Sequence, residues 1–176
     1  AGQLGQALIN STPTGVELLA SSRSGGDGLM KLDLTDAAAC RQVVVEQRPD
    51  WVLNAGAYTA VDKAEAEPEL AHAVNGGAPR AFAEAIQTHG GRMLQLSTDF
   101  VFNGQQGSPY RVAQSRDPLG VYGASKASGE AAVAARSSRP RSIASSPTAT
   151  DTSYQLAAPP SHQCSTGGRS TSSRLL

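Results

Sequence analysis

The chain has 176 residues and a formal net charge of zero at pH 7, which leaves room for one ordinary domain with a real core. The charge is uneven, because residues 1–135 hold 10 Lys and Arg against 14 Asp and Glu, whereas residues 136–176 hold 5 against 1. With no apolar run of membrane-span length, no leader peptide and no metal-type spacing of Cys and His, we expect a cytoplasmic protein without a membrane partner, disulfide framework or metal site.

The chain opens with the stretch AGQLGQALI, in which Gly2 and Gly5 stand directly before a helical pattern. In a nucleotide-binding crossover, such glycines let the backbone approach a pyrophosphate on a helix N-terminus. Alone this is a weak match, because a plain loop before a helix has the same pattern. A strand is predicted at residues 16–20. The SSR stretch that ends at Arg23 follows it, at the position where enzymes that prefer NAD place an acidic residue against the adenosine ribose. This cation favours NADPH and admits NADH, although Arg23 also fits a solvated loop.

From there to about residue 134, short apolar runs alternate with helical patterns, as in a parallel sheet wrapped by helices. Their apolar continuity suits strands buried on both faces, and it predicts strands at residues 29–32, 51–55 and 93–97. Helices are predicted at residues 36–47 with Asp36 as N-cap, at 68–88 with a break near 76–79, and from Tyr122 to about residue 135. The predicted fold is α/β, with a Rossmann-like doubly wound parallel sheet.

The sequence changes character at residues 135–176, which are rich in Ser, Arg and Pro. The last 41 residues hold 16 Ser and Thr, no Lys or Glu, and no strand-like apolar run. Such a segment buries too little apolar surface to offset the entropy of ordering it. We therefore expect an NAD(P)-binding domain at residues 1–134 and a disordered tail whose deletion leaves the fold no less stable. Its arginines are too dispersed to indicate a nucleic-acid partner, and an out-of-frame translation would show the same abrupt change.

Tyr122 and Lys126 stand four residues apart in VYGASK and therefore share one face of the predicted helix. A phenol and an ammonium on one face suit proton transfer, because the ammonium stabilises the phenolate. The same spacing occurs by chance on many surface helices. Thr98 and Asp99 follow the strand predicted at residues 93–97, at the sheet edge where ligands collect. The hydroxyl suits a hydrogen bond to a carbonyl, and both residues also suit a turn.

Three further stretches occur in order: DLTD from Asp33, NAGAYTAVDKAE from Asn54 and STDFVFNG from Ser97. Together with the glycine-rich start and VYGASK, they closely resemble the dTDP-4-dehydrorhamnose reductase family, within the extended short-chain dehydrogenases/reductases. The resemblance covers residues 1 to about 134. It implies a Rossmann-like fold that here lacks the first strand and the C-terminal substrate domain of the family.

The resemblance also implies a role for each matching residue. Thr98, Tyr122 and Lys126 match the catalytic set, and Thr98 and Asp99 match substrate-contacting residues. Tyr122 and Lys126 are also expected at the cofactor, where Lys126 would hold the nicotinamide ribose. With Arg23, the remaining expected cofactor-binding residues are Gly2, Gln3, Leu4, Gly5, Asp33, Leu34, Ala55, Gly56, Ala57 and Thr59.

The implied reaction is the NADPH-dependent reduction of dTDP-4-dehydro-6-deoxy-L-mannose (dTDP-4-dehydrorhamnose) to dTDP-L-rhamnose, in nucleotide-sugar and cell-surface polysaccharide biosynthesis. The implied partners are the dTDP-sugar and, in the full-length family, a second copy in a homodimer. Without a substrate domain, we expect activity to suffer. Two alternatives are a non-catalytic dinucleotide-binding regulatory subunit, which has no chemical need for Thr98, Tyr122 and Lys126, and a nucleotide-sugar epimerase or dehydratase, which the STD and AYTAVDKAE stretches disfavour.

Overall fold

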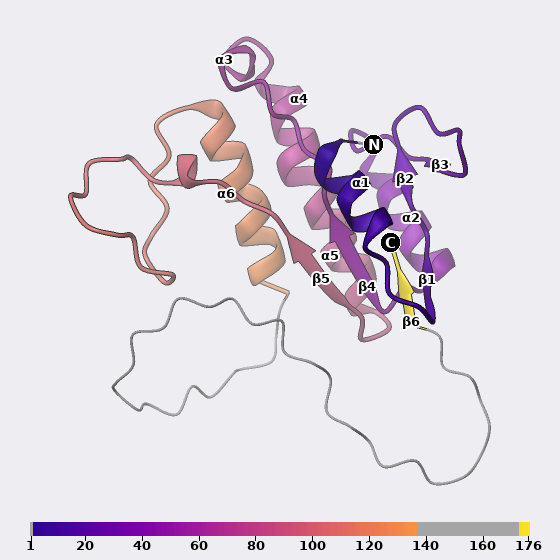
Figure 1. The fold of residues 1–176 in the computed structure, drawn as a ribbon. Helices are drawn as coiled ribbons and strands as arrows, with labels where there is room; N and C mark the ends of the chain where they lie inside the picture. Colours follow the sequence, from indigo (N-terminus) through magenta and orange to yellow (C-terminus); the bar gives the residue numbers. More distant parts are fainter. Residues whose placement is uncertain (1, 137–172) are drawn as a thin grey trace, which may run out of the picture. The chain divides into compact units, whose positions relative to one another are not determined.

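A computed structural model of the chain describes residues 2–136 and 173–176 (Figure 1). Ala1–Ser138 and Ser172–Leu176 form one compact unit, and the second unit, Arg139–Thr171, lies outside the described residues. The predicted tail is therefore compared with the structure only at its two ends. Among the described residues, no helix is both long and apolar enough to cross a bilayer.

A four-stranded parallel sheet runs through this unit in the order β1–β6–β4–β5. Its strands are β1 (Val16–Leu18), β4 (Trp51–Asn54), β5 (Arg92–Gln95) and β6 (Ser173–Leu175). In the register of β1 and β6, Leu18 pairs with Leu175, and on the other side of β6 Trp51 pairs with Leu175. A separate parallel pair consists of β2 (Ser21–Ser22) and β3 (Met30–Lys31), so the predicted strand at residues 29–32 lies outside the main sheet.

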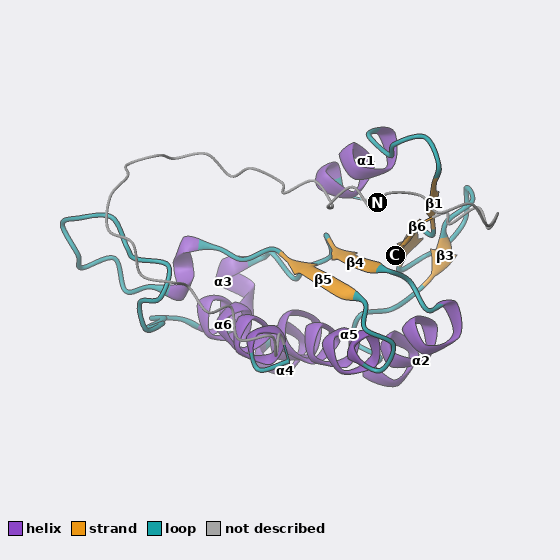
Figure 2. Cartoon of the chain, turned by 90° about the horizontal axis from the view of Figure 1, so that it is seen from below, coloured by secondary structure: helices purple, strands orange, loops and turns teal. Residues whose placement is uncertain are grey.

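Helices cover both faces of the main sheet (Figure 2). One face carries α2 (Ala37–Gln47), α4 (Pro68–His72), α5 (Ala78–Gln87) and α6 (Val121–Ala134), and the other carries α1 (Gln3–Asn10). The core lies between the sheet and the first group, where Cys40, Val44, Val52, Phe82 and Ile86 are each at most 3% exposed. This arrangement confirms the doubly wound α/β fold predicted from the alternation of strands and helices.

The α2 helix begins and packs as its sequence predicts. Asp36 is its N-cap, and its carboxylate accepts a hydrogen bond of 2.9 Å from the backbone N–H of Ala39. This bond satisfies one of the N–H groups that a first helical turn leaves without a partner. Cys40 is fully buried on the inner face, and this burial raises the pKa of its thiol to about 12. At neutral pH the thiol therefore stays protonated and serves as a small apolar core group.

The predicted break near residues 76–79 is wrong, because α4 runs through a π-helical turn, η1 (Ala73–Gly77), directly into α5. Gly76 serves close packing: a Cβ on this residue would lie 3.0 Å from the Ser128 hydroxyl oxygen of α6. Pro79 stands in the first turn of α5, directly after this π-helical turn. The α5 helix ends at Gln87, and the turn after it reaches Gly90, whose φ of +79° is in the left-handed region that glycine adopts without strain.

The strand β6 is the largest departure from the sequence-based expectations, because it lies in the segment predicted to be a disordered tail. Its backbone is bonded on both sides: the Leu19 N–H donates to the Leu175 carbonyl over 2.8 Å, and the Leu176 N–H donates to the Trp51 carbonyl over 2.9 Å. The prediction was wrong for these last residues, since pairing with two neighbouring strands stabilises a run too short to be recognised alone. Residues 137–172 lie outside the described part.

Candidate cofactor and catalytic site

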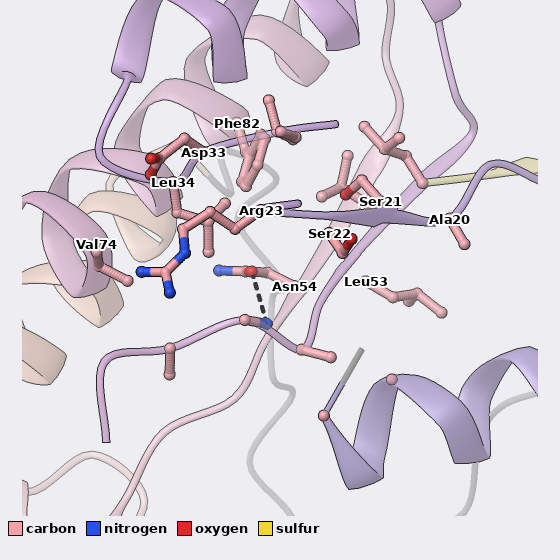
Figure 3. Close-up of a pocket in the computed structure, with 18 of the residues that line it drawn as sticks. Ala20, Ser21, Ser22, Arg23, Asp33, Leu34, Leu53, Asn54, Val74 and Phe82 are labelled. Carbon is pink, nitrogen blue, oxygen red and sulfur yellow. Dashed lines mark hydrogen bonds between the residues drawn. The ribbon is translucent and has the colours of Figure 1, made fainter. Parts of the chain in front are cut away.

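A cavity of about 640 Å³ lies where β1 and β4 end, at the carboxyl edge of the parallel sheet (Figure 3). Of the predicted cofactor residues, those that line it are Gly2, Gly5, Arg23, Asp33, Leu34, Ala55, Gly56 and Ala57. Gln3, Leu4 and Thr59 do not line this cavity, and neither do Thr98, Asp99, Tyr122 and Lys126. The structure thus groups most of the predicted cofactor residues and places the predicted catalytic residues on neighbouring elements.

The N-terminus of α1 contributes one part of the cavity. Gly2 is the N-cap of this eight-residue helix, and no side chain caps its first N–H groups. A Cβ on Gly2 would meet nothing within 4 Å, so the glycine leaves open space in front of these donors. Free N–H groups and the helix dipole attract an anion. This end of the cavity therefore has the chemistry that a pyrophosphate requires.

Arg23 and Asp33 bring charge to the same cavity. Figure 3 shows the Arg23 side chain among the residues that line the cavity. The Asp33 carboxylate accepts bonds of 2.9 Å from both the N–H and the hydroxyl of Thr35. These bonds, with smaller contributions from Arg23 and Lys31, hold the pKa of Asp33 below its ordinary value. Asp33 is therefore an ionised acceptor at neutral pH, beside a guanidinium suited to a phosphate.

The loop that follows β4 is shaped by Asn54, which is 7% exposed. Its amide donates to the Gln95 side chain of β5 over 2.8 Å, and its oxygen accepts from the Gly56 N–H over 3.2 Å. Gly56 allows a close contact, because a Cβ there would lie 2.5 Å from the Leu34 Cδ1 and would require the leucine side chain to move. This close approach brings the Ala55–Gly56–Ala57 stretch against the strand end that carries Asp33 and Leu34.

Asn75 links this loop to α6, and sequence reasoning missed it. The residue is 2% exposed in η1, and its side chain bonds both the N–H and the carbonyl of Tyr58, over 2.9 and 3.0 Å. Its amide also donates to the Ser125 hydroxyl over 3.0 Å, and that hydroxyl donates to the Tyr122 carbonyl over 2.7 Å. A continuous set of hydrogen bonds thus joins the cofactor loop to the helix of Tyr122. Only the fold brings Asn75 to both, so no local pattern indicated it.

Tyr58 is a second phenol beside the cavity, and the structure gives it a structural role. Its hydroxyl donates to the Glu67 carboxylate over 2.6 Å. This hydrogen bond is the main reason that the pKa of Tyr58 is raised to about 12. The Tyr58 proton is therefore engaged by the Glu67 carboxylate, and the phenol serves to anchor the loop after β4.

Lys126 is buried on α6 with 5% of its surface exposed. Its ammonium donates to the Leu96 carbonyl, just beyond β5, over 2.7 Å. Burial lowers the pKa of Lys126, and the opposing effect of Glu130 is smaller. An ammonium has three donors, so two remain for other acceptors after the bond to Leu96. A lysine buried at the carboxyl edge of the sheet is a candidate functional group.

Thr98 and Tyr122 come from two elements that touch. Thr98 caps a short 3₁₀ turn, η2 (Asp99–Val101): its hydroxyl donates to the Asp99 carboxylate over 3.1 Å and accepts from the Phe100 N–H over 3.3 Å. The rings of Phe100 and Tyr122 pack edge to face with centroids 5.6 Å apart. A Cβ on Gly123 would lie 2.2 Å from the Phe100 carbonyl oxygen, so only glycine permits this approach of α6. The turn role weighed for Thr98 and Asp99 is thus present in the structure.

Comparison with known proteins places this geometry in context. Residues 1–143 match the family described as the RmlD substrate binding domain. The dTDP-4-dehydrorhamnose reductase of Streptomyces griseus is 54% identical over 102 residues, which are 58% of this chain and 34% of that protein. Its counterpart in Sinorhizobium fredii is 40% identical over 137 residues, which are 76% of this chain and 43% of that protein.

A solved structure has a similar fold. The crystal structure of dTDP-4-dehydrorhamnose reductase from Bacillus anthracis in complex with NADP superposes with a TM-score of 0.62 and 34% identity, over 76% of this chain and 46% of that one. The chain thus spans between a third and a half of the length of these relatives. The matched residues 1–143 include every residue that lines the cavity except Leu176, and the helix that carries Tyr122 and Lys126.

Proposed function

The chain belongs to the RmlD substrate binding domain family, and from this premise we propose that it takes part in the NADPH-dependent reduction of dTDP-4-dehydrorhamnose to dTDP-L-rhamnose. The observation that carries the proposal is the hydrogen-bonded connection through Asn75, which couples the loop lining the cavity to the helix of Tyr122 and Lys126. In this proposal, a cofactor held in the cavity and a proton donor on α6 act in one site.

The cavity fits a dinucleotide phosphate in three ways. The uncapped N-terminus of α1 at Gly2 suits the pyrophosphate. The Asp33 carboxylate beside Leu34 suits hydroxyl and amino donors of the adenosine half. The Arg23 guanidinium suits a ribose 2′-phosphate and favours NADPH over NADH. When bound, the reduced nicotinamide supplies the hydride that reduces the sugar carbonyl.

Residues of α6, with Thr98 at the start of η2, donate the proton and stabilise the charges that its transfer creates. Tyr122 gives its phenol proton to the carbonyl oxygen as that oxygen becomes an alkoxide, and Thr98 donates a hydrogen bond to the same oxygen. To do so, the Thr98 hydroxyl turns from the Asp99 carboxylate, to which it now donates. The positive charge of Lys126 stabilises the phenolate left on Tyr122, and its bond to the Leu96 carbonyl fixes its place. The Asp99 carboxylate is then free to accept a hydrogen bond from a hydroxyl of the sugar.

The cellular setting and assembly of the protein follow the family in this proposal. A nucleotide-sugar reductase uses water-soluble substrates, so we place the protein in the cytoplasm. In the longer chain of the family, the partner is a second copy in a homodimer.

Arg23 provides a test of the cofactor proposal. Replacing Arg23 by alanine is expected to weaken NADPH binding by roughly 10- to 100-fold, because a charge-assisted hydrogen bond to the phosphate is worth about 1.5–3 kcal/mol. NADH, which lacks that phosphate, is expected to bind the variant and the parent equally. Calorimetric titration of both cofactors measures the effect.

Arg111→Ala is the matched control, since Arg111 is an exposed arginine that does not line the cavity. It is expected to leave both affinities unchanged. Equal losses for NADPH and NADH in the Arg23 variant, or no loss for either, would remove Arg23 from phosphate recognition.

A further inference from the structure

The N-terminus of α6 is capped by a residue from a distant part of the chain. The Glu65 carboxylate accepts a hydrogen bond of 2.7 Å from the backbone N–H of Val121, the first residue of the helix. Glu65 follows α3 (Val61–Ala64) and lies 56 residues before Val121. The N-cap residue itself, Gly120, has no side chain that could make this bond. Glu65 therefore provides, from a distant part of the chain, the hydrogen-bond acceptor that a Ser or Asp at the N-cap position usually provides.

The lack of a side chain on Gly120 allows this carboxylate to approach closely. A Cβ on Gly120 would lie 2.8 Å from the Glu65 Oε1 and would force the two apart. The φ of Gly120 is −132°, an extended conformation open to any residue, so backbone strain does not explain the glycine. Close approach of Glu65 does explain it.

Glu65 stands apart from the other acidic side chains of the stretch at residues 62–69. In the structure Glu67 bonds the Tyr58 hydroxyl, whereas Glu65 reaches across to α6. A negative charge at a helix N-terminus also interacts favourably with the helix dipole.

The first turn of α6 is therefore held from three directions. Glu65 fixes the N–H of Val121, the Ser125 hydroxyl with Asn75 behind it fixes the carbonyl of Tyr122, and Gly123 rests against the Phe100 carbonyl. Tyr122 lies in the middle of this turn. We propose that Glu65 is a positioning residue for Tyr122: its bond to Val121 sets the entry of α6 and thereby the place of the phenol against η2. The proposal rests on the proposed reductase function for its catalytic consequence.

Three substitutions at Glu65 separate the hydrogen bond from the charge. Glu65→Gln keeps an acceptor oxygen at the same reach and loses the charge; Glu65→Asp keeps the charge and loses the reach; Glu65→Ala loses both. If the bond positions Tyr122, the glutamine variant retains the single-turnover rate of carbonyl reduction, and the other two lose about tenfold. NADPH affinity is expected to stay within about twofold in all three. The matched control is Glu69→Ala, which removes an exposed acid of the same stretch.

A second readout needs no turnover. Nuclear magnetic resonance of the cofactor-free chain reports the Val121 amide proton and the Tyr122 ring, whose resonances depend on the neighbouring Phe100 ring. The alanine and aspartate variants are expected to shift both signals, and the glutamine and Glu69→Ala variants are expected to leave them in place. A Tyr122 ring signal that does not move in Glu65→Ala overturns the positioning role.

The two readouts also distinguish the positioning proposal from the proposed function. If the parent chain shows no hydride transfer while the resonances follow the expected pattern, the reductase function fails for this chain and the positioning of Tyr122 by Glu65 stands. If turnover is present but all three Glu65 variants share the parent rate, the positioning proposal fails and the reductase function stands.

Discussion

Replacing Tyr122 by phenylalanine is expected to slow carbonyl reduction by about 10²–10⁴-fold, which is the range in which a positioned proton donor contributes. The substitution removes one oxygen and keeps the ring, so its edge-to-face packing on Phe100 should survive. NADPH affinity should change little, because Tyr122 does not line the cavity. Rapid mixing of the chain, NADPH and the dehydro-sugar nucleotide, with the loss of reduced nicotinamide followed by absorbance, measures the rate.

The control for this experiment is Tyr110→Phe. The Tyr110 ring stacks on Phe102 with centroids 4.2 Å apart, and its hydroxyl bonds Asn103 over 3.3 Å, on a loop outside the cavity. The same chemical change there should leave the rate unaltered. A Tyr122→Phe variant that reduces the sugar at the parent rate would exclude Tyr122 as the proton donor.

Deleting Ser173–Leu176 is expected to lower the stability of the domain by roughly 2–6 kcal/mol, because four backbone hydrogen bonds join this segment to neighbouring residues, each worth about 0.5–1.5 kcal/mol. The donors are the N–H groups of Leu19, Asp50, Leu53 and Leu176. A loss of this size is a large share of the 5–15 kcal/mol typical of a domain. Thermal unfolding of the deleted and intact chains measures this loss of stability. The prediction replaces the sequence-based expectation that deletion of the tail leaves the fold no less stable.

A control and a second measurement make this prediction specific. Arg174→Ala removes an exposed ion pair of 2.9 Å with Glu17 and keeps the backbone of β6, so it should cost only about 0.2–1 kcal/mol. In the intact chain, the amides of Leu19 and Leu53 should exchange slowly with solvent, since they donate to the carbonyls of Leu175 and Leu176. An unchanged unfolding midpoint after the deletion, together with fast exchange of these amides, would show that β6 is not part of the sheet in solution.

The sequence predicted the local elements well because their signals are local. The N-cap at Asp36, the apolar run of β4 and the Tyr122–Lys126 spacing each depend on a few neighbouring residues, and the structure contains the corresponding elements. The family resemblance drawn from the glycine-rich start, NAGAYTAVDKAE, STDFVFNG and VYGASK is confirmed by the match over residues 1–143. Short motifs within these stretches were therefore enough to indicate the family.

What the sequence did not predict depends on long-range contacts. Asn75 and Glu65 gain their roles only when the fold brings them to Ser125 and Val121, 50 and 56 residues away. The glycine at Gly76 was interpreted as a helix breaker, whereas it permits the contact with Ser128. Such roles are set by tertiary packing, which overrides local propensity.

The strand β6 shows the same limit at the level of the sheet. In the usual doubly wound order, the strand between those that correspond to β1 and β4 leads into the glycine-rich turn. Here Ser173–Leu175 occupies that position, and Leu176 lines the cavity together with Gly2. Two leucines after an arginine have too little pattern to predict a central strand. Partners on both sides, from β1 and β4, give the segment its structure.

The most direct test of the account is a single-turnover experiment with the chain in excess over dTDP-4-dehydrorhamnose and with NADPH present. We predict that reduced nicotinamide disappears in a one-to-one ratio with dTDP-L-rhamnose, identified by mass and chromatography, and that Tyr122→Phe suppresses both. Saturable NADPH binding by a folded chain without any product would contradict the reductase function and leave a dinucleotide-binding module.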